Sequence, residues 1–343
     1  MLRCIQLGKK GLGTTAPNPM VGCVVVYKNQ IIGEGFTSPY GGAHAEVNAI
    51  NSVKDKELLS KATLYVSLEP CSHFGKTPPC TNLIIEHKIP EVFIGLQDPH
   101  DKVAGKGIEK LEESGCKVTV GILEKECRIH HKRFLSFQEK KRPYIILKWA
   151  ETQDGFIAPD DILRKKKPQP VWITNAHSKQ LVHQWRSEEQ AILVGTNTVL
   201  ADNPKLTVKT WEGKHPIRVV LDKDLKIPSH SHVLDTKVKT IVLTQIDDSS
   251  KYLDGVDYEL IDFSVSVAQQ ICSVLCKHSI TSLLIEGGSK TLQTFIDANL
   301  WDEARIFKGP TTFKSGINSP KISGRLLETK PIVSDTLSIF VND

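Results

Sequence analysis

Two stretches decide the fold of the N-terminal half: Ala43-His44-Ala45-Glu46-Val47 and Glu69-Pro70-Cys71-Ser72-His73-Phe74-Gly75-Lys76-Thr77-Pro78-Pro79-Cys80. His44, Cys71 and Cys80 are three zinc-type ligands, and a tetrahedral zinc held by three protein ligands keeps its fourth position open for water. Zinc deaminases need such a set, because the metal lowers the pKa of a bound water and a non-ligand glutamate moves protons between that water and the leaving amine. Glu46, two residues beyond the histidine, is the predicted catalytic residue.

The spacing of the two cysteines departs from the generic deaminase signature, which is H-x-E followed by P-C-x-x-C. His44, Glu46 and Pro70-Cys71 match it, but eight residues separate Cys71 from Cys80. The β-rich run 63–68 predicts a strand that delivers Glu-Pro-Cys, and Cys80 is expected to open a helix. The histidine and the glutamate are both expected near a helix N-terminus, from which they can point into one pocket.

Two other interpretations of these residues stay open. A cytosolic cysteine is more often a small buried apolar residue than a metal ligand. A zinc held here could also be purely structural, with no open position. That second interpretation leaves Glu46 without a role, so the catalytic interpretation is favoured.

Length and composition set the general class. The 343 residues exceed the size at which one hydrophobic core usually keeps growing, so two domains are expected. Hydrophobic residues make up 40% and charged residues 24%, as in soluble globular proteins. The sequence shows neither an apolar run long enough for a membrane span nor a signal peptide at its start, and its eight cysteines lack the spacing of a disulfide framework, so we expect a cytoplasmic protein with no membrane partner.

The net charge of +5 is mild, and it permits a phosphate-bearing ligand while giving little support to nucleic-acid binding. Strand and helix patterns alternate on both sides of the charged stretch 138–143, which ends in Pro143. Such alternation predicts layered α/β sheets. The expected domains are residues 1–142, which carry the zinc motif, and residues 143–343.

The second half carries a candidate phosphate site at Glu286-Gly287-Gly288-Ser289-Lys290-Thr291, which follows a predicted strand and opens a predicted helix. Glycine lets the backbone approach a ligand closely, and the free N–H groups of a helix N-terminus bind phosphate. A Gly-Gly turn alone is a weak signal, since many such junctions are only turns. It is not the G-x-G-x-x-G fingerprint, so a Rossmann domain is not supported.

The motifs taken together resemble the bifunctional riboflavin-biosynthesis deaminase/reductase family. In the first half they are Pro17-Asn18-Pro19, Val21-Gly22-Cys23-Val24-Val25, the histidine motif and the long cysteine loop, which separates this family from cytidine and tRNA-adenosine deaminases. In the second half they are the runs 171–174, 183–187 and 191–207 and Glu286-Gly287-Gly288. The resemblance covers nearly the whole chain. It implies a cytidine-deaminase-like three-layer α/β/α domain followed by a dihydrofolate-reductase-like α/β domain, that is, a zinc-dependent pyrimidine deaminase at residues 1–142 and an NADPH-dependent reductase at residues 143–343.

The implied activity has two steps. Zinc-dependent deamination of 2,5-diamino-6-(5-phosphoribosylamino)pyrimidin-4-one comes first, with Asn18, His73 and Lys76 as candidates for holding the base and the ribose phosphate. NADPH-dependent reduction of the ribosyl side chain follows and gives 5-amino-6-(5-phosphoribitylamino)uracil. A homo-oligomer, dimer or tetramer, is also expected, and no nucleic-acid partner.

The resemblance implies two sets of residues in the reductase. Those expected on NADPH are Ala150, Trp172, Thr198, Asp202, Gly288, Ser289, Lys290 and Thr291. Those expected on the ribose-phosphate substrate are Arg186, Leu206, Lys209 and Glu286. The planar guanidinium of Arg186 suits a phosphate, because it can donate two parallel hydrogen bonds.

Three residues depart from the family pattern. Asn203 replaces a frequent second aspartate, Lys209 replaces an arginine, and Lys223 stands near a common hydroxyl residue. Two alternative functions stay open, and the first of them rests on these three departures. One is a monofunctional deaminase whose second domain only binds ligands. The other is a nucleic-acid deaminase, which is disfavoured by the cysteine spacing, the 6% aromatic content and the mild charge.

Overall fold

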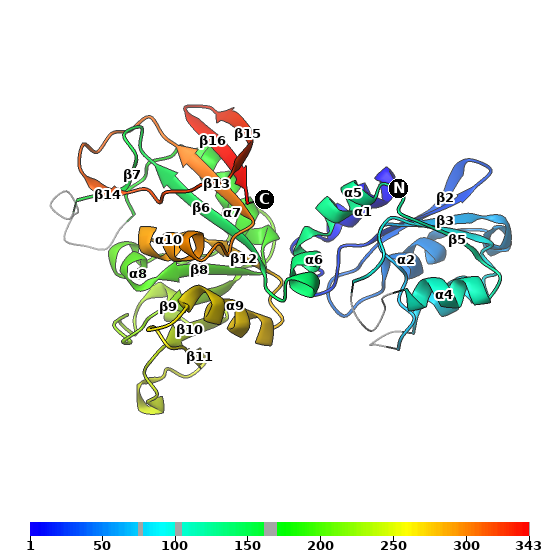
Figure 1. Cartoon of the computed structure of the whole chain (residues 1–343), viewed down its shortest axis with the longest axis horizontal. Helices are drawn as coiled ribbons and strands as arrows, with labels where there is room; N and C mark the ends of the chain where they lie inside the picture. The colour runs from blue at the N-terminus through cyan, green and yellow to red at the C-terminus, as the bar shows by residue number, and fades with distance from the viewer. Residues whose placement is uncertain (75–77, 100–104, 161–169, 343) are drawn as a thin grey trace. The chain divides into compact units, whose positions relative to one another are not determined.

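The structure is a computed structural model that describes residues 1–74, 78–99, 105–160 and 170–342. The chain divides into two compact units, Met1–Lys141 and Arg142–Asp343. Each unit has its own sheet and its own hydrophobic cores (Figure 1).

The first unit is built on a five-stranded sheet with the order β2-β1-β3-β4-β5. Strand β1 lies between β2 and β3 and runs antiparallel to both, whereas β3, β4 and β5 are parallel. Its strands are β1 (Gly22–Tyr27), β2 (Gln30–Phe36), β3 (Thr63–Val66), β4 (Glu91–Ile94) and β5 (Lys117–Val120). Its helices are α1 (Leu2–Gly8), α2 (Ala45–Ser52), α3 (Cys80–Glu86), α4 (Lys106–Glu113), α5 (Glu124–His130) and α6 (Lys132–Glu139).

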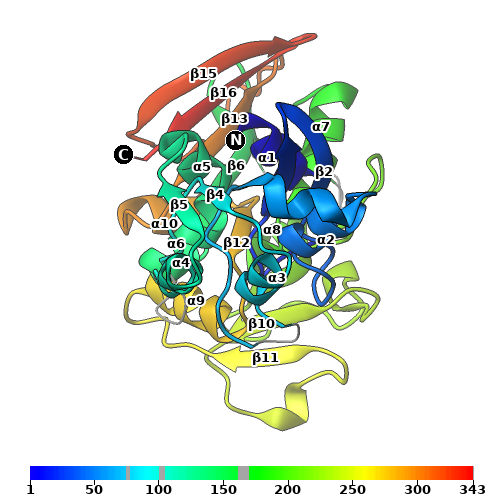
Figure 2. The same cartoon turned by 90° about the vertical axis from the view of Figure 1, so that its right-hand side faces the viewer.

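Alternation along β1 explains why helices cover both faces of this sheet. Successive side chains of a strand point to opposite faces. Val24 packs with Cys4 and Leu7 of α1, whereas Cys23 and Val25 belong to the core that contains α2. The result is a three-layer α/β/α arrangement, visible in Figures 1 and 2.

The second unit is built on a nine-stranded sheet with the order β11-β10-β9-β8-β12-β6-β13-β16-β15. The seven strands from β11 to β13 are parallel, and β16 and β15 add an antiparallel hairpin at one edge. Its strands are β6 (Tyr144–Glu151), β8 (Ala191–Gly195), β9 (Ile217–Leu221), β10 (Thr240–Thr244), β11 (Asp257–Leu260), β12 (Ser282–Ile285), β13 (Glu303–Lys308), β15 (Arg325–Ile332) and β16 (Asp335–Val341); β7 (Phe156–Pro159) and β14 (Gly316–Asn318) pair separately.

Helices again cover both faces of this sheet. On one face α9 (Val267–Lys277) and α10 (Ser289–Asp297) pack on the core that contains Ile145, Leu147 and Leu283. On the other face α7 (Ala176–Glu188) packs beside Ile146 and Leu284, and α8 (Thr196–Asp202) packs beside Val194. The strands at the centre of the sheet are apolar on both faces, as expected for a parallel sheet covered by helices.

The structure also contains elements that the sequence did not predict. They are the helices α5, α6 and α8 and the strands β7, β11 and β13 to β16. The hairpin β15–β16 has weak periodicity because most of β15 is exposed, so its residues do not alternate between core and solvent.

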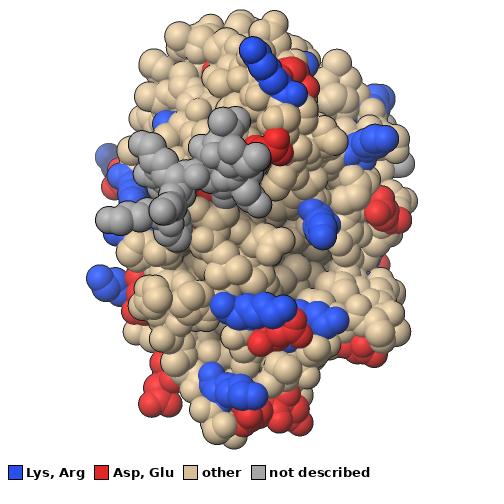
Figure 3. Space-filling view, turned by 90° about the vertical axis from the view of Figure 1, so that its left-hand side faces the viewer, with Lys and Arg blue, Asp and Glu red and all other residues tan. Residues whose placement is uncertain are grey.

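Among the described residues, no helix is long and apolar enough to cross a membrane. Figure 3 shows one face of the molecule, on which lysine and arginine side chains are scattered among acidic and uncharged residues. Among the described residues drawn on that face, the basic side chains do not form one continuous patch.

Candidate active sites

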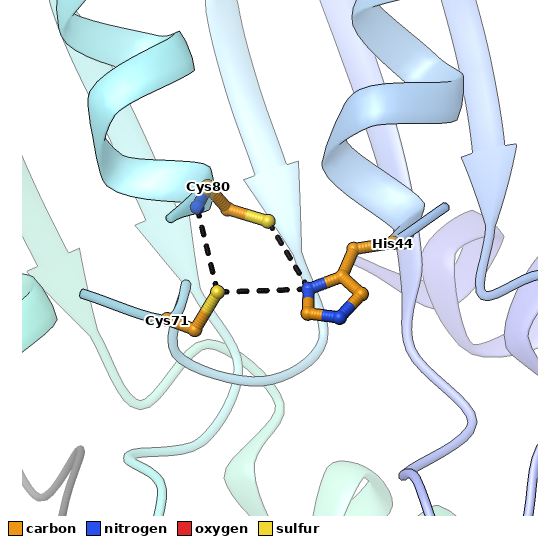
Figure 4. Close-up of side chains that lie close together, drawn as sticks. All are labelled: His44, Cys71 and Cys80. Atoms are coloured by element: carbon orange, nitrogen blue, oxygen red, sulfur yellow. Dashed lines mark hydrogen bonds between the residues drawn. The ribbon is translucent and has the colours of Figure 1, made fainter. Parts of the chain in front are cut away.

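The first candidate site is a cluster of His44, Cys71 and Cys80, which lies at the ends of three different elements. His44 is the N-cap of α2, Cys71 follows β3 in a loop, and Cys80 is the first residue of α3. Their donor atoms all lie within 4.8 Å of one another. Figure 4 shows that the two sulfur atoms and the imidazole converge on one point.

The distances in this cluster fit a zinc ion. The Nδ1 atom of His44 lies 3.5 Å from the sulfur of Cys71 and 3.3 Å from that of Cys80. Tetrahedral zinc with a Zn–S bond of about 2.3 Å and a Zn–N bond of about 2.0 Å requires a nitrogen–sulfur separation of about 3.5 Å. The three side chains are therefore already arranged as ligands, and they leave the fourth position free.

The N-terminus of α3 also contributes to the cluster. The backbone N–H of Cys80 donates a hydrogen bond to the sulfur of Cys71 at 3.4 Å. Hydrogen bonding from the Cys80 thiol lowers the pKa of Cys71 to about 4, and His44 adds to this effect. The site therefore stabilises a thiolate at Cys71, which is the form that binds metal.

Glu46 lies in the first turn of α2, two residues from His44, and is only 4% exposed. Burial raises the pKa of its carboxyl to about 7. A carboxyl that titrates near neutral pH can both accept and donate a proton, as general acid–base catalysis requires. Its side chain also contacts the Cys80 thiol, which places it beside the cluster.

The predicted substrate residues of this unit lie in loops. Asn18 is half-buried in the segment that precedes β1, and its backbone N–H donates to the carbonyl of Thr15. His73 is exposed in the cysteine loop. Lys76 lies outside the described residues, so its predicted role stays a prediction.

The second candidate site is at the carboxyl ends of the parallel strands of the second unit, where open α/β sheets bind their ligands. Glu286 follows β12 and accepts two hydrogen bonds from Arg186 of α7, at 2.7 and 2.8 Å. The third N–H group of Arg186, at Nη1, donates to the carbonyl of Thr207 at 3.1 Å. Of the predicted substrate residues, Arg186 and Glu286 are therefore in direct contact.

Lys148 is a member of this site that the sequence analysis missed. It comes from β6, its side chain is 14% exposed, and its Nζ lies 3.5 Å from Oε2 of Glu286. Burial lowers the pKa of Lys148, and Glu286 opposes that effect. A single lysine within the apolar run Tyr144–Trp149 was the signal that could have found it, since a charged residue in a buried strand needs a partner.

The remaining substrate residues lie in the segment after α8. Leu206 is buried and has a positive φ of 54°. The backbone N–H of Lys209 lies 3.3 Å from Nδ1 of His183, while the Lys209 side chain is exposed. This segment is thus attached to α7 by both His183 and Arg186.

The predicted cofactor residues fall into two groups. Thr198, Gly288 and Thr291 are close together, because a Cβ on Gly288 would lie 3.3 Å from the Thr198 hydroxyl and one on Gly195 would lie 2.6 Å from that of Thr291. Two helix N-termini, those of α8 and α10, therefore lie close together here, and free N–H groups at a helix N-terminus favour a phosphate. The hydroxyl of Ser289 donates to the carbonyl of Asn318, and Lys290 is exposed.

The second group consists of Ala150, Asp202 and Trp172. Ala150 is near the end of β6, and Asp202 is the last residue of α8. Trp172 is 62% exposed, and the ammonium of Lys179 lies 3.8 Å from the centre of its ring. The exposed indole and the adjacent cation offer a stacking surface and a positive charge, both suited to a nucleotide.

Comparison with known proteins identifies both units. Residues 1–96 match the family model of the cytidine and deoxycytidylate deaminase zinc-binding region, and residues 143–319 match that of the RibD C-terminal domain. The class is thus a two-domain enzyme, with a zinc-type deaminase and a reductase on one chain. This class agrees with the fold and with the two sites.

Relatives match along nearly the whole chain. The riboflavin biosynthesis protein RibD of Aquifex aeolicus is 38% identical, and the match covers 96% of this chain and 91% of the relative. The riboflavin biosynthesis protein RibD of Bacillus amyloliquefaciens is 39% identical, and the match covers 94% of this chain and 87% of that relative. A solved Thermotoga maritima structure, a diaminohydroxyphosphoribosylaminopyrimidine deaminase/5-amino-6-(5-phosphoribosylamino)uracil reductase, has a TM-score of 0.89 at 38% identity, with 100% of this chain and 97% of that chain covered. The chain belongs to the RibD family of bifunctional riboflavin-biosynthesis enzymes.

Family membership confirms the predicted fold class and the predicted pair of activities, a deaminase and a reductase. It also confirms the two cofactors, zinc for the deaminase and NADPH for the reductase. The roles of the individual residues stay predictions.

Proposed function

We propose that His44, Cys71 and Cys80 hold the zinc of the deaminase and that Glu46 is its proton-transfer residue. When bound, the metal lowers the pKa of a coordinated water and so supplies the hydrolytic nucleophile near neutral pH. The convergence of the three donor atoms beside a buried carboxyl is the observation that carries this proposal. A purely structural zinc would not require that carboxyl.

Glu46 has two tasks in the deamination. Its carboxylate accepts a proton from the attacking water and donates it to the ring nitrogen. It then accepts the second proton, from the hydroxyl group now on the tetrahedral carbon, and donates it to the leaving amine. One water is consumed, the C–N bond breaks, ammonia leaves, and the carbon keeps the oxygen as a carbonyl. A buried carboxyl beside the three donor atoms is placed to make these transfers.

The substrate of the deaminase is proposed to be 2,5-diamino-6-(5-phosphoribosylamino)pyrimidin-4-one. Asn18, His73 and Lys76 are proposed to hold its base and its ribose phosphate. His73 is supported by its exposure in the cysteine loop, next to the metal ligands in sequence. The extra length of that loop would then add groups that bind the substrate.

The reductase site is proposed to bind the phosphoribosyl group through Arg186, Leu206, Lys209 and Glu286, together with Lys148. Arg186 and Lys148 carry two positive charges against the single negative charge of Glu286, so the group has a net charge of +1. A buried net positive charge favours an anionic substrate. The reduction adds one hydride and one proton across the C1′–N bond of the opened ribosylamino group.

The cofactor is proposed to lie against Ala150, Trp172, Thr198, Asp202 and the N-terminus of α10 from Gly288 to Thr291. When bound, NADPH supplies the hydride. The N–H groups at the start of α10 are suited to its phosphates, and the paired glycines Gly287 and Gly288 allow the backbone to approach them closely.

The test is a coupled assay on the purified protein with zinc, NADPH and the diaminopyrimidine ribotide made in situ. Ammonia and NADPH absorbance are followed in parallel for the unmodified protein and for Glu46→Gln. We expect ammonia release and NADPH oxidation in the unmodified protein, and neither in the variant. NADPH oxidation should return when the variant receives the deaminated pyrimidine.

Other outcomes separate the alternatives. Ammonia release without NADPH oxidation would mean that the second unit only binds ligands. Full deamination by Glu46→Gln would remove the proposed role of that residue. A folded, zinc-loaded protein that is inactive on the ribotide would direct attention to nucleosides and nucleic acids.

A homo-oligomer, either dimer or tetramer, and a cytoplasmic location are further parts of the proposal. Light scattering coupled to size-exclusion chromatography tests the first, with a mass above 38.1 kDa expected. The domain boundary at 142/143 is also proposed. Expression of residues 1–142 alone should give a folded unit that binds zinc.

A further inference from the structure

Glu69 is a buried carboxylate next to the metal site that has no role in the proposed reaction. It is 4% exposed, and it follows β3 two residues before Cys71. Its oxygens accept four backbone hydrogen bonds. Oε2 accepts from Asp98 and Gly105, both at 3.1 Å, and Oε1 accepts from Gly107 at 2.9 Å and from Ile108 at 3.4 Å.

Three of these donors belong to the beginning of α4. The first N–H groups of a helix have no partner within the helix, and a side chain at the N-cap normally satisfies one of them. The N-cap of α4 is Gly105, which has no side chain and has a positive φ of 88°. Glu69 supplies the missing cap from a distant part of the sequence, with a negative charge at the positive end of the helix dipole.

The backbone next to Glu69 packs directly on the same helix. A Cβ on Gly107 would lie 2.2 Å from the carbonyl oxygen of Pro70, so only glycine fits there. Proline has a fixed φ, which limits the movement of the chain between Glu69 and Cys71. The position of Cys71 is therefore tied to the start of α4.

Cys71 is held from the other side by α3. Its carbonyl accepts from the N–H of Thr81 at 3.2 Å, and its sulfur accepts from the N–H of Cys80 at 3.4 Å. Two helix N-termini thus fix one metal ligand, α3 directly and α4 through Glu69. Groups that orient a ligand in this way typically change metal affinity or activity about 10–100-fold when they are removed.

We propose that Glu69 is a positioning residue for the deaminase, which sets the location of the Cys71 sulfur by capping α4. This inference rests on the proposed function, because it assumes that Cys71 binds the metal. A carboxylate is suited to this task since it only accepts hydrogen bonds. In a glutamine at position 69, the NH2 group would replace one carboxylate oxygen. Its N–H atoms would then face two backbone N–H groups that need an acceptor.

The test compares Glu69→Gln with the unmodified protein, both with cobalt in place of zinc. The visible spectrum of a cobalt–thiolate site depends on the geometry of the ligands, and it does not change when only stability falls. We expect the cobalt spectrum of Glu69→Gln to be shifted. We expect its zinc affinity, measured in competition with a chelator, to be about 10–100-fold lower. The backbone amides of residues 105–112 should exchange hydrogen faster than in the unmodified protein. The rate at which the variant reduces added deaminated pyrimidine should be unchanged, which would show that the second unit is still folded and active.

A matched control is Asp55→Asn, because Asp55 caps a short helix of the same unit through Glu57 N–H at 3.1 Å and is exposed. It should keep the spectrum and the zinc affinity. A second variant, Gly107→Ala, keeps the Glu69 residue but places a methyl group 2.2 Å from the Pro70 carbonyl oxygen and 3.0 Å from Oε1 of Glu69. It should shift the cobalt spectrum as well.

The outcomes are distinguishable. If the unmodified protein binds neither metal, the proposed function itself fails. Another outcome is that the unmodified protein binds both zinc and cobalt, while Glu69→Gln and Gly107→Ala show the same cobalt spectrum and the same zinc affinity as the unmodified protein. In that case Glu69 is not a positioning residue.

Discussion

Arg186 and Glu286, one hundred residues apart in the sequence, are joined by two parallel hydrogen bonds, from Nε to Oε1 at 2.7 Å and from Nη2 to Oε2 at 2.8 Å. Both side chains are largely buried, and Lys148 lies on the same carboxylate. The guanidinium face that suits a phosphate is thus occupied by Glu286 in this structure. Glu286 connects α7, β6 and the turn that opens α10, and its charge has consequences for stability.

Stability should depend on pH through Glu286. Burial opposes ionisation, but Arg186 and Lys148 overcome it and lower the pKa of Glu286 from 4.5 to about 2. Because the pKa of Glu286 is lower in the folded chain than in the unfolded chain, its ionisation stabilises the folded protein fully at pH values above the unfolded pKa. This stabilisation is lost as the pH falls toward the folded pKa. The full contribution is about 3 kcal/mol.

The measurement is the free energy of unfolding in urea for the unmodified protein and for Glu286→Gln. The difference should be about 3 kcal/mol at pH 7, still present at pH 5, and roughly half as large at pH 3. A difference of the same size at pH 3 and pH 7 would contradict the assigned ionisation.

Replacing Lys148 should impair the reductase alone. Lys148→Met removes one of the two cations of the site but keeps the apolar volume of β6. We expect NADPH oxidation with the deaminated pyrimidine to fall about 10–100-fold, since the site then has no net positive charge for the phosphate. Ammonia release from the diaminopyrimidine should be unchanged.

Lys277→Met provides the control for Lys148, because Lys277 is an exposed lysine of the same unit that pairs with Glu259 at the surface. Its reductase activity should match that of the unmodified protein. Equal activity of Lys148→Met and Lys277→Met would exclude Lys148 from the site.

Metal removal should separate the two activities. Among the residues that the structure describes, His44, Cys71 and Cys80 form the one group with metal-ligand geometry, and all three belong to the first unit. Dialysis against a chelator should abolish ammonia release and leave the reduction of added deaminated pyrimidine intact. Zinc should restore ammonia release, and a parallel loss of both activities would argue against independent sites.

His131 should make the first unit less stable in mild acid. It is 1% exposed, its Nε2 lies 3.1 Å from the hydroxyl of Ser67, and burial holds its pKa well below the ordinary value. Below a pH of about 6.5 the unfolded chain gains a proton that the folded chain does not bind. The free energy of unfolding should therefore decrease there, by up to about 1.4 kcal/mol per pH unit.

His131→Gln tests this prediction, because its amide can still reach Ser67 and does not titrate. The unmodified protein should lose more stability than the variant between pH 7 and pH 5, as measured by urea unfolding with zinc absent from both samples. Parallel curves for the two proteins would show that His131 is not the titrating group.

The sequence by itself determined the chemistry of the first site and most of the regular elements. The spacing of His44, Glu46, Cys71 and Cys80 is informative because zinc accepts few ligand types and because each residue lies next to a strong helix or strand signal. The apolar runs that became β6, β8, β9, β10 and β12 were recognisable because strands buried on both faces lack polar residues. Lys148 interrupts one such run, and its partner cannot be found without the fold.

Only the tertiary structure decided which distant residues meet. The pairing of Arg186 with Glu286 depends on the order of β6, β12 and β8 in the sheet, and local sequence does not encode that order. Glu69 caps α4 from another part of the chain, a contact that the local sequence around Gly105 does not encode. The strands β13 to β16 were missed for the same reason. Their stability comes from hydrogen bonds to neighbouring strands and not from local periodicity.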